Sequence, residues 1–392
     1  MSEVIVELLA RRPPAADDQP DRLRTLLELL DRPDHAVPTV WVAGSHGRSS
    51  VITMMAALFA ALDVTAGTTT RPHLQDLRER VRVAGAVIDR TVLQEQLEYL
   101  TPFLSEVDVR FPAPLGFDEV VFALACTWFA DAPVDVAVHE GPPVDSGRVE
   151  LLVELDPRRG ARVRGPEGAA HLDGDGFGVA DRAVAVGGQR LTLRGATGAV
   201  PDVYLPLHGA HQAGNAATAL AAVEAFLGYS GEVDADLIRT AFASVRLPGR
   251  LEVIRRPEAA SVLLDGARDA VGTAALATAL REEFAVRHRI GVVAPVAGDP
   301  STLVAPLATT LDHVVVTDAP APDAPPCAEV AAAVRAAGVP VEQAETIEQA
   351  LEQATGLATA EDAIVVLGGL QTAGAARRAL GLDAADDVVD TG

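Results

Sequence analysis

The segment 42–51, VAGSHGRSSV, contains the residue types and spacing most suggestive of chemistry. A glycine turn at the start of a helix exposes backbone N–H groups and the positive helix end, which together bind phosphates and other anions. The long Walker pattern fails twice, because Val42 replaces its first glycine and Arg48 replaces its lysine, although Ser50 falls where a hydroxyl would ligate Mg²⁺. An ordinary glycine turn between strand and helix is the alternative. The predicted anion cradle comprises Gly44, Ser45, His46, Gly47, Arg48, Ser49 and Ser50.

All 32 basic residues of the chain are arginine, and lysine is absent. This excludes every mechanism that needs a lysine amine, including Schiff bases, a carbamylated lysine and the usual lysine of a phosphate-binding loop. A guanidinium carries the same charge as an ammonium, but its planar fork does not substitute freely for a compact point charge.

The elements around this segment are typical of a nucleotide-binding α/β unit. VPTVWVAG (37–44) predicts a buried strand, and SSVITMMAALFAAL (49–62) predicts an apolar helix after the glycine turn. The parallel rhythm is expected to break near residue 145. Further helices are predicted over 21–32, 92–104 and 117–130, and a strand over 134–141.

Residues 146–206 consist of short segments rich in Gly, Asp and Arg, and an alternation of predicted strands and helices begins again at about residue 247. RAVAVGGQRLTLR (182–194) predicts a hairpin around a Gly-Gly turn. HLDGDGFG (171–178) lacks the later ligands of a calcium loop, which favours a tight turn. A second α/β alternation is expected to have strands at 261–267, 289–295, 312–318 and 363–369, and helices at 270–284, 328–337 and 347–356. The predicted domains are therefore 1–246 and 247–392.

Composition narrows the function classes. The chain has 392 residues, of which 49% are hydrophobic, and 55 acidic residues give a formal net charge of -23. A field of this sign repels nucleic acid and anionic lipid, so we expect neither as a partner. Two cysteines, no apolar run of transmembrane length and no apolar signal segment lead us to expect a cytoplasmic protein.

Several blocks in order resemble one enzyme family. Six blocks are similar to segments of the dihydrofolate synthase/folylpolyglutamate synthase branch of the Mur ligase superfamily. They are GSHGRSSVITMMAALFAA (44–61), TTTRPHLQDLRERVRVAGAVI (68–88), FDEVVFALACTWFADAPVDVAVHEG (117–141), LHGAHQAGNAATALAA (207–222), LPGRLEVI (247–254) and LLDGARDAVGTAALATAL (263–280). The resemblance implies an α/β fold with a P-loop N-terminal domain and a Rossmann-like C-terminal domain. It also implies ATP and Mg²⁺ as cofactors and a folate-like molecule as substrate.

In that family, ATP phosphorylates a carboxylate and the amine of L-glutamate then displaces phosphate. The resemblance implies that Arg48, Arg250 and Asp265 occupy catalytic positions, and that Ser50 and Glu140 occupy metal-ligand positions. It implies that Arg71 and His73 contact substrate. The implied nucleotide-binding set adds His211, Asn215, Arg250, Asp265 and Arg268 to the cradle residues. Taken singly, Glu140 and Asp265 are better explained as polar strand ends, Asn215 as a helix start and Arg250 as an ion-pair partner. As an ordered set they favour an inherited binding site.

The departures from the family pattern are specific. Arg48 replaces the P-loop lysine, Arg71 replaces a serine near the metal, and Arg268 replaces a histidine. The stretch that follows Glu140 in the family, with a metal-binding histidine and a carbamylated lysine, is missing from GPPVDSGR (141–148). A phosphoryl-transfer site without its metals loses its largest electrostatic contribution.

We therefore predict a pseudoenzyme of this family that keeps a role in binding a nucleotide, another anion or a protein partner. Two alternatives stay open. One is an active ATP-dependent ligase that adds L-glutamate to a folate-like carboxylate with altered residues. The other is a metal-free anion-binding scaffold within a larger complex.

Overall fold

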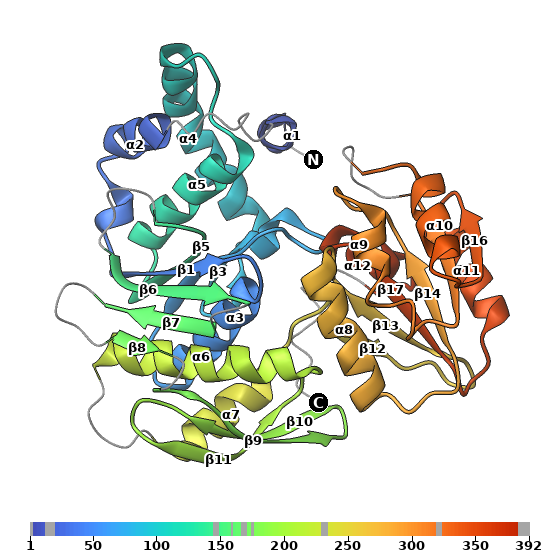
Figure 1. Ribbon diagram of the computed structural model, residues 1–392. Coiled ribbons are helices and arrows are strands. Elements are labelled where there is room, and N and C mark those ends of the chain that lie inside the picture. The colour runs from blue at the N-terminus through green and yellow to red at the C-terminus, as the bar shows by residue number, and fades with distance from the viewer. Residues whose placement is uncertain are drawn as a thin grey trace.

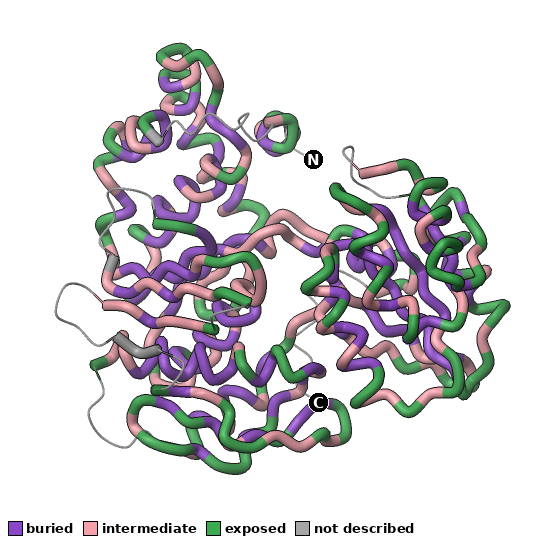
Figure 2. The backbone as a smooth tube through the Cα atoms, in the orientation of Figure 1, coloured by how far each residue is buried: buried purple, intermediate pink, exposed green. Residues whose placement is uncertain are grey.

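The computed structural model describes residues 3–11, 20–143, 149–157, 160–165, 171–173, 176–228, 234–318 and 324–382. They form two α/β bodies that lie side by side (Figure 1). The buried residues follow the strands and the inner faces of the helices in both bodies (Figure 2). Each body therefore has its own core, and the predicted two-domain α/β fold is confirmed.

The N-terminal domain is built on an eight-stranded sheet with the order β4-β3-β2-β5-β1-β6-β7-β8. Its centre is parallel, and short antiparallel strands extend both edges. The strands are β1 (Thr39–Gly44), β2 (Ala66–Thr69), β3 (Val81–Val83), β4 (Ala86–Val87), β5 (Val136–Glu140), β6 (Val149–Asp156), β7 (Gly160–Arg164) and β8 (His171–Asp173).

Helices cover both faces of this sheet because its central strands are apolar on both sides. Val40 and Val42 of β1 pack toward α3 and α6, whereas Trp41 packs against Phe122 of α5 with ring centroids 5.5 Å apart. One face carries α3 (Arg48–Ala61), α6 (Ala210–Leu227) and α7 (Ala235–Ser244), and the other carries α1 (Glu3–Ala10), α2 (Pro20–Leu29), α4 (Arg90–Arg110) and α5 (Phe117–Asp131). Two 3-10 turns, η1 (Pro33–His35) and η2 (Leu77–Arg80), complete the domain.

A small antiparallel sheet lies below α6 and α7 (Figure 1). Its strands are β9 (Gly178–Ala185), β10 (Gly188–Arg194) and β11 (Ala199–Leu205). The predicted hairpin over 182–194 is confirmed, since β9 and β10 pair across the turn at Val186 and Gly187.

The C-terminal domain is a six-stranded sheet with the order β12-β13-β17-β14-β15-β16. Its strands are β12 (Arg250–Ile254), β13 (Ser261–Asp265), β14 (Arg289–Val293), β15 (His313–Thr317), β16 (Val341–Ala344) and β17 (Ala363–Leu367). One face packs against α8 (Ala270–Glu283), α9 (Pro300–Val304) and α10 (Cys327–Ala336), and the other against α11 (Ile347–Leu357) and α12 (Leu370–Ala379). All neighbouring strands are parallel except β12, which pairs with β13 in the antiparallel sense.

Some predicted elements need correction. The α/β alternation ends after β5 as predicted, because strands β6 to β11 follow before the next described helix, α6. The first of these strands, β6, nevertheless still pairs with β1 in the parallel sense, and the antiparallel pairing begins at β7. The C-terminal sheet has six strands in place of the four predicted, because β12 and β16 are half-exposed edge strands with weak apolar patterns. Residues 144–148, where the family stretch after Glu140 was predicted to be missing, lie outside the described residues. Residues 174–175, in the predicted tight turn, also lie outside them. We propose that the domain boundary falls at 246/247, just before β12.

Candidate functional site

A cavity of about 520 Å³ lies between the two domains, where the loop after β1 meets the ends of β12 and β13. Nearly all the predicted site residues line it. They are Ser45, His46, Gly47, Arg48, Ser49, Ser50, Arg71, Glu140, His211, Asn215, Arg250, Asp265 and Arg268. Gly44 and His73 do not line the cavity.

Two glycines shape the loop between β1 and α3. Gly44 has a φ of 127° and Gly47 a φ of 82°, a region that side chains with a Cβ rarely occupy. A Cβ on Gly44 would lie 2.2 Å from the Leu155 carbonyl oxygen, and one on Gly47 would lie 2.6 Å from Oδ1 of Asn215. The loop can therefore pass close to β6 and α6 only with glycine at both positions.

The backbone amides of this loop are available to a ligand. Within the described parts of the chain, none of the N–H groups of residues 45–50 donates a hydrogen bond to another protein group. They lie at the N-terminus of α3, where unsatisfied donors and the helix dipole favour an anion. The geometry fits the phosphates of a nucleotide.

Arg48 forms an ion pair with Glu140 on the neighbouring strand β5. Its Nε donates to Oε1 of Glu140 at 2.9 Å, and its Nη1 donates to the Gly44 carbonyl oxygen at 2.5 Å. The second carboxylate oxygen, Oε2 of Glu140, accepts the backbone N–H of Arg71 at 2.9 Å. The Glu140 side chain is only 2% exposed, so this pair lies at the bottom of the cavity. Together 45–50, Arg71 and Glu140 form what we call the P-loop face.

This donor set does not fit a magnesium ion. Each oxygen of Glu140 accepts one hydrogen bond, and the Arg48 guanidinium, 2.9 Å from Oε1, would lie beside any cation bound to this carboxylate. Two like charges about 4 Å apart repel by about 4 kcal/mol at an effective dielectric constant near 20. In the described residues no cluster of three or more His, Cys, Asp or Glu side chains could hold a metal. The predicted metal ligands Ser50 and Glu140 thus share a cavity, but Glu140 is bound to an arginine.

A second group of cavity residues, which we call the linker face, consists of His211, Asn215, Arg250 and Asp265. Arg250 Nη2 donates to the Ser49 hydroxyl at 3.1 Å, which joins the C-terminal domain to the P-loop. Burial lowers the pKa of Arg250, and burial raises the pKa of Asp265 to about 6 against the opposing effect of Arg250. Asp265 also accepts the backbone N–H groups of Leu251 and Ala267 at 2.9 and 2.8 Å.

A histidine of the loop between β1 and α3 bridges the domains at the cavity mouth. His46 Nε2 lies 2.8 Å from Oδ2 of Asp269, the N-cap of α8. Burial would raise the pKa of Asp269, but hydrogen bonds from the Gly272 N–H and from His46 lower it. Arg268, next to Asp269, is exposed and lines the same cavity. Sequence reasoning missed the His46–Asp269 contact because no local spacing connects residues 223 positions apart.

His73 has a structural environment outside the cavity. Its Nδ1 accepts a hydrogen bond from Arg80 Nε at 2.9 Å, and burial together with Arg80 lowers its pKa. Arg80 also pairs with Asp118 at 2.7 Å and lies 4.6 Å from the centre of the Phe117 ring. The predicted contact of His73 with substrate therefore stays a prediction.

The structure adds cavity residues that the sequence analysis did not select. The turn between β6 and β7 contributes Asp156, Pro157, Gly160 and Ala161, and α6 contributes Gln212 and Thr218. No motif marks the β6–β7 turn, whereas Gln212 and Thr218 lie at helical spacing from the predicted His211 and Asn215. The helical periodicity around His211 and Asn215 could therefore have predicted Gln212 and Thr218 as cavity residues.

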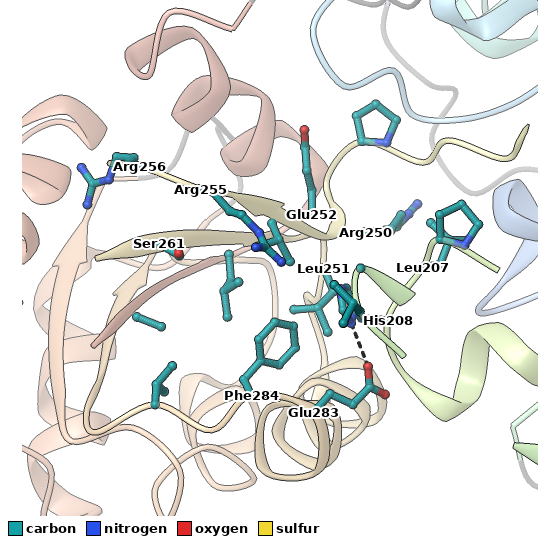
Figure 3. Close-up of a pocket in the computed structure, with 18 of the residues that line it drawn as sticks. Leu207, His208, Arg250, Leu251, Glu252, Arg255, Arg256, Ser261, Glu283 and Phe284 are labelled. Atoms are coloured by element: carbon teal, nitrogen blue, oxygen red, sulfur yellow. Dashed lines mark hydrogen bonds and ion pairs between the residues drawn. The ribbon is translucent and has the colours of Figure 1, made fainter. Parts of the chain in front are cut away.

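A second, larger cavity of about 1340 Å³ opens on the other side of the β12 start (Figure 3). Arg250 alone of the predicted site residues lines it. On its wall, Glu283 of α8 accepts hydrogen bonds from His208 Nδ1 at 2.9 Å and from the Gly209 N–H at 2.8 Å, and it also pairs with Arg182. Because Glu283 is fully buried, this cluster fixes one domain against the other.

Comparison with known proteins agrees with this fold. Residues 249–370 match the family model described as the Mur ligase, glutamate ligase domain. The chain therefore has the C-terminal domain of the Mur ligases. A curated relative, the dihydrofolate synthase/folylpolyglutamate synthase of Mycobacterium tuberculosis, is 34% identical over 97% of this chain and 94% of its own length. The chain belongs to the dihydrofolate synthase/folylpolyglutamate synthase family.

Solved structures agree in fold. Folylpolyglutamate synthase from Mycobacterium tuberculosis, complexed with ADP and AMPPCP, superposes with a TM-score of 0.86 and 31% identity over 97% of this chain and 98% of that one. The enzyme from Thermotoga maritima superposes with a TM-score of 0.78 at 23% identity, over 97% of this chain and 96% of that one, which supports the fold alone.

The curated alignment also indicates a shorter chain. It runs over 463 positions but includes only 97% of 392 residues, so the relative has tens of residues without a counterpart here. A search of the described helices finds none with the length and apolarity needed to cross a membrane.

Proposed function

We propose that this protein is a nucleotide-binding member of the folylpolyglutamate synthase family that does not form the glutamate amide. The observation that carries this proposal is the ion pair between Arg48 and Glu140, with the Arg71 N–H on the second carboxylate oxygen. Glu140, at the expected metal-ligand position, and Arg48, at the expected lysine position, instead form an ion pair with each other.

Phosphoryl transfer depends on cations placed to stabilise the charge on the transferred group. Arg48 supplies charge, but its Nε and Nη1 are bound to Glu140 and to the Gly44 carbonyl oxygen. No lysine exists in the chain to take over. Removal of this electrostatic stabilisation typically costs orders of magnitude in rate for each lost group. The expected result is binding without turnover.

Binding of a nucleotide is supported by the unpaired loop amides, by Arg250 beside Ser49, and by the relatives solved with ADP and AMPPCP. A folate-like second ligand is supported more weakly, because it rests on a relative solved with AMPPCP and folate at 20% identity. We also propose a cytoplasmic location, in keeping with two free cysteines. A protein partner stays a prediction.

The direct test is a ligase assay. Purified protein, ATP, Mg²⁺ and L-glutamate are incubated with dihydropteroate or with a reduced folate, and ADP and glutamylated products are measured by mass spectrometry. The Mycobacterium tuberculosis relative is the positive control. We expect no product that depends on both glutamate and the acyl substrate. Product formation that requires both and stops on chelation would overturn the proposal.

An active ligase with altered residues is the second candidate. It is favoured by 34% identity over nearly the whole chain and by a linker face that keeps His211, Asn215, Arg250 and Asp265 around one cavity. The same assay decides between the two.

A further inference from the structure

We propose that the interdomain cavity binds the metal-free form of a nucleoside triphosphate, with Arg48 taking the place of the magnesium ion. The inference rests on the proposed nucleotide-binding function and names the form of the ligand. It differs from the usual arrangement, in which the phosphates enter together with a divalent ion.

The first argument is charge balance at Glu140. A carboxylate in a phosphate site repels the ligand unless a cation lies between them. Here the guanidinium of Arg48 satisfies Oε1 of Glu140 at 2.9 Å, and the Arg71 N–H satisfies Oε2. Because that cation is covalently part of the chain, the neutralisation needs no metal.

The second argument is the number of hydrogen-bond donors in the cavity lining that remain available to a ligand. Nη2 of Arg48 makes no hydrogen bond within the described residues, and the exposed Arg268 makes none either. Arg250 contacts Ser49, the fifth of residues 45–50, whose backbone N–H groups are unpaired within the described residues. Guanidinium groups bind phosphate oxygens through directed, charge-assisted hydrogen bonds.

The third argument is competition from the acidic residues of the same cavity. Besides Glu140, these are Asp156, Asp265 and Asp269. Asp265 accepts two backbone N–H groups, and Asp269 is paired with His46. Within the described residues, these carboxylates do not form a cluster of three or more side chains that could hold a metal ion. A free triphosphate carries more negative charge than its magnesium complex and gains more from the arginines.

The test is isothermal titration calorimetry of the full chain with ATP, in EDTA and in excess Mg²⁺. We expect affinity in EDTA at least threefold higher than in Mg²⁺. In Arg48→Ala, Glu140 is released, and we expect at least tenfold weaker binding in EDTA with a reversed preference. Arg48→Lys keeps the charge but cannot hold Glu140 and Gly44 together, and should shift the preference in the same direction. Arg110→Ala, at an exposed ion pair, is the matched control.

The outcomes separate the two proposals. Binding that is weaker in EDTA than in Mg²⁺, or less than threefold tighter, overturns this inference and leaves nucleotide binding standing. An unchanged preference in folded Arg48→Ala and Arg48→Lys, checked by circular dichroism, also overturns it. No heat under either condition overturns nucleotide binding itself. Ligase turnover in the separate assay overturns only the absence of catalysis.

Discussion

The two faces of the interdomain cavity differ in what they have kept. The linker face brings His211, Asn215, Arg250 and Asp265 together as the family resemblance implies. The P-loop face keeps its glycine geometry and unpaired amides, but its carboxylate is bound to an arginine. The comparison teaches that the backbone of an anion site can persist while the side chains that make it catalytic change, because the two depend on different residues.

The largest expected effect concerns the P-loop face. Glu140→Ala leaves Arg48 without its partner, and removal of one member of a buried pair is strongly destabilising. Because the Arg48 side chain is 23% exposed, we expect a loss of about 2 to 4 kcal/mol in the free energy of unfolding. Urea unfolding followed by tryptophan fluorescence measures it.

Glu106→Ala is the control for that variant. Glu106 pairs with Arg110 on the surface, where both side chains are about half exposed, and such pairs contribute about 1 kcal/mol or less. Equal effects of the two substitutions would contradict a buried structural role for the Arg48–Glu140 pair.

The linker face is expected to matter for binding more than for stability. Arg250→Ala removes a guanidinium that reaches Ser49 across the domains. A hydrogen bond to a charged group contributes about 1.5 to 3 kcal/mol, so nucleotide affinity should fall about 10- to 100-fold. Calorimetry with ATP measures the loss.

Arg255→Ala is the matched control, because Arg255 follows the opposite end of β12, is exposed, and lines the other cavity. An equal loss of affinity in both variants would mean that general charge, and not the position of Arg250, supports binding.

Acid should affect the two domains in opposite directions. Burial lowers the pKa of His139 to about 3, below an unfolded value near 6.5, so the folded N-terminal domain binds fewer protons and loses stability as pH falls through that window. Burial raises the pKa of Asp265 to about 6, above an unfolded value near 3.9, so its contribution improves as pH falls from 6 to 4. Each slope approaches about 1.4 kcal/mol per pH unit at most.

Fluorescence isolates the first of these slopes, because both tryptophans, Trp41 and Trp128, lie in the N-terminal domain. Urea titrations between pH 7 and 4.5 should show a falling free energy of unfolding. His139→Phe, which keeps a ring beside Trp41 and Phe122, should flatten the slope. A slope that persists in this variant would assign the acid sensitivity to other groups.

The sequence was sufficient for the fold and for most of the cavity. Strand, glycine turn and helix around 42–51 follow from apolar patterns and backbone sterics, which are local properties. The ordered blocks then placed Arg250 and Asp265 against the P-loop. The edge strands β12 and β16 were missed because a half-exposed strand has a weak apolar pattern.

What the sequence could not supply is which charges pair. Arg48 lies 92 positions from Glu140, and His46 lies 223 positions from Asp269. Whether Arg48 points to a ligand or to a carboxylate depends on distances that only the packed strands β1 and β5 determine. Composition showed that lysine was missing, but it could not show what its replacement would contact.

The smallest predicted effect is the sharpest test of the comparison. The Asp269 side chain lies at the cavity mouth, is 43% exposed and is paired with His46. Asp269→Asn keeps a good N-cap for α8, so stability should change by less than about 0.5 kcal/mol. It removes one partly screened negative charge from the mouth of the interdomain cavity, which should tighten ATP binding in EDTA about threefold. Asp299→Asn, at the exposed N-cap of α9, is the matched control and should change neither quantity. Weaker binding in Asp269→Asn would instead mean that the His46–Asp269 contact holds the two faces together for the ligand, and that the mouth of the cavity belongs with the linker face.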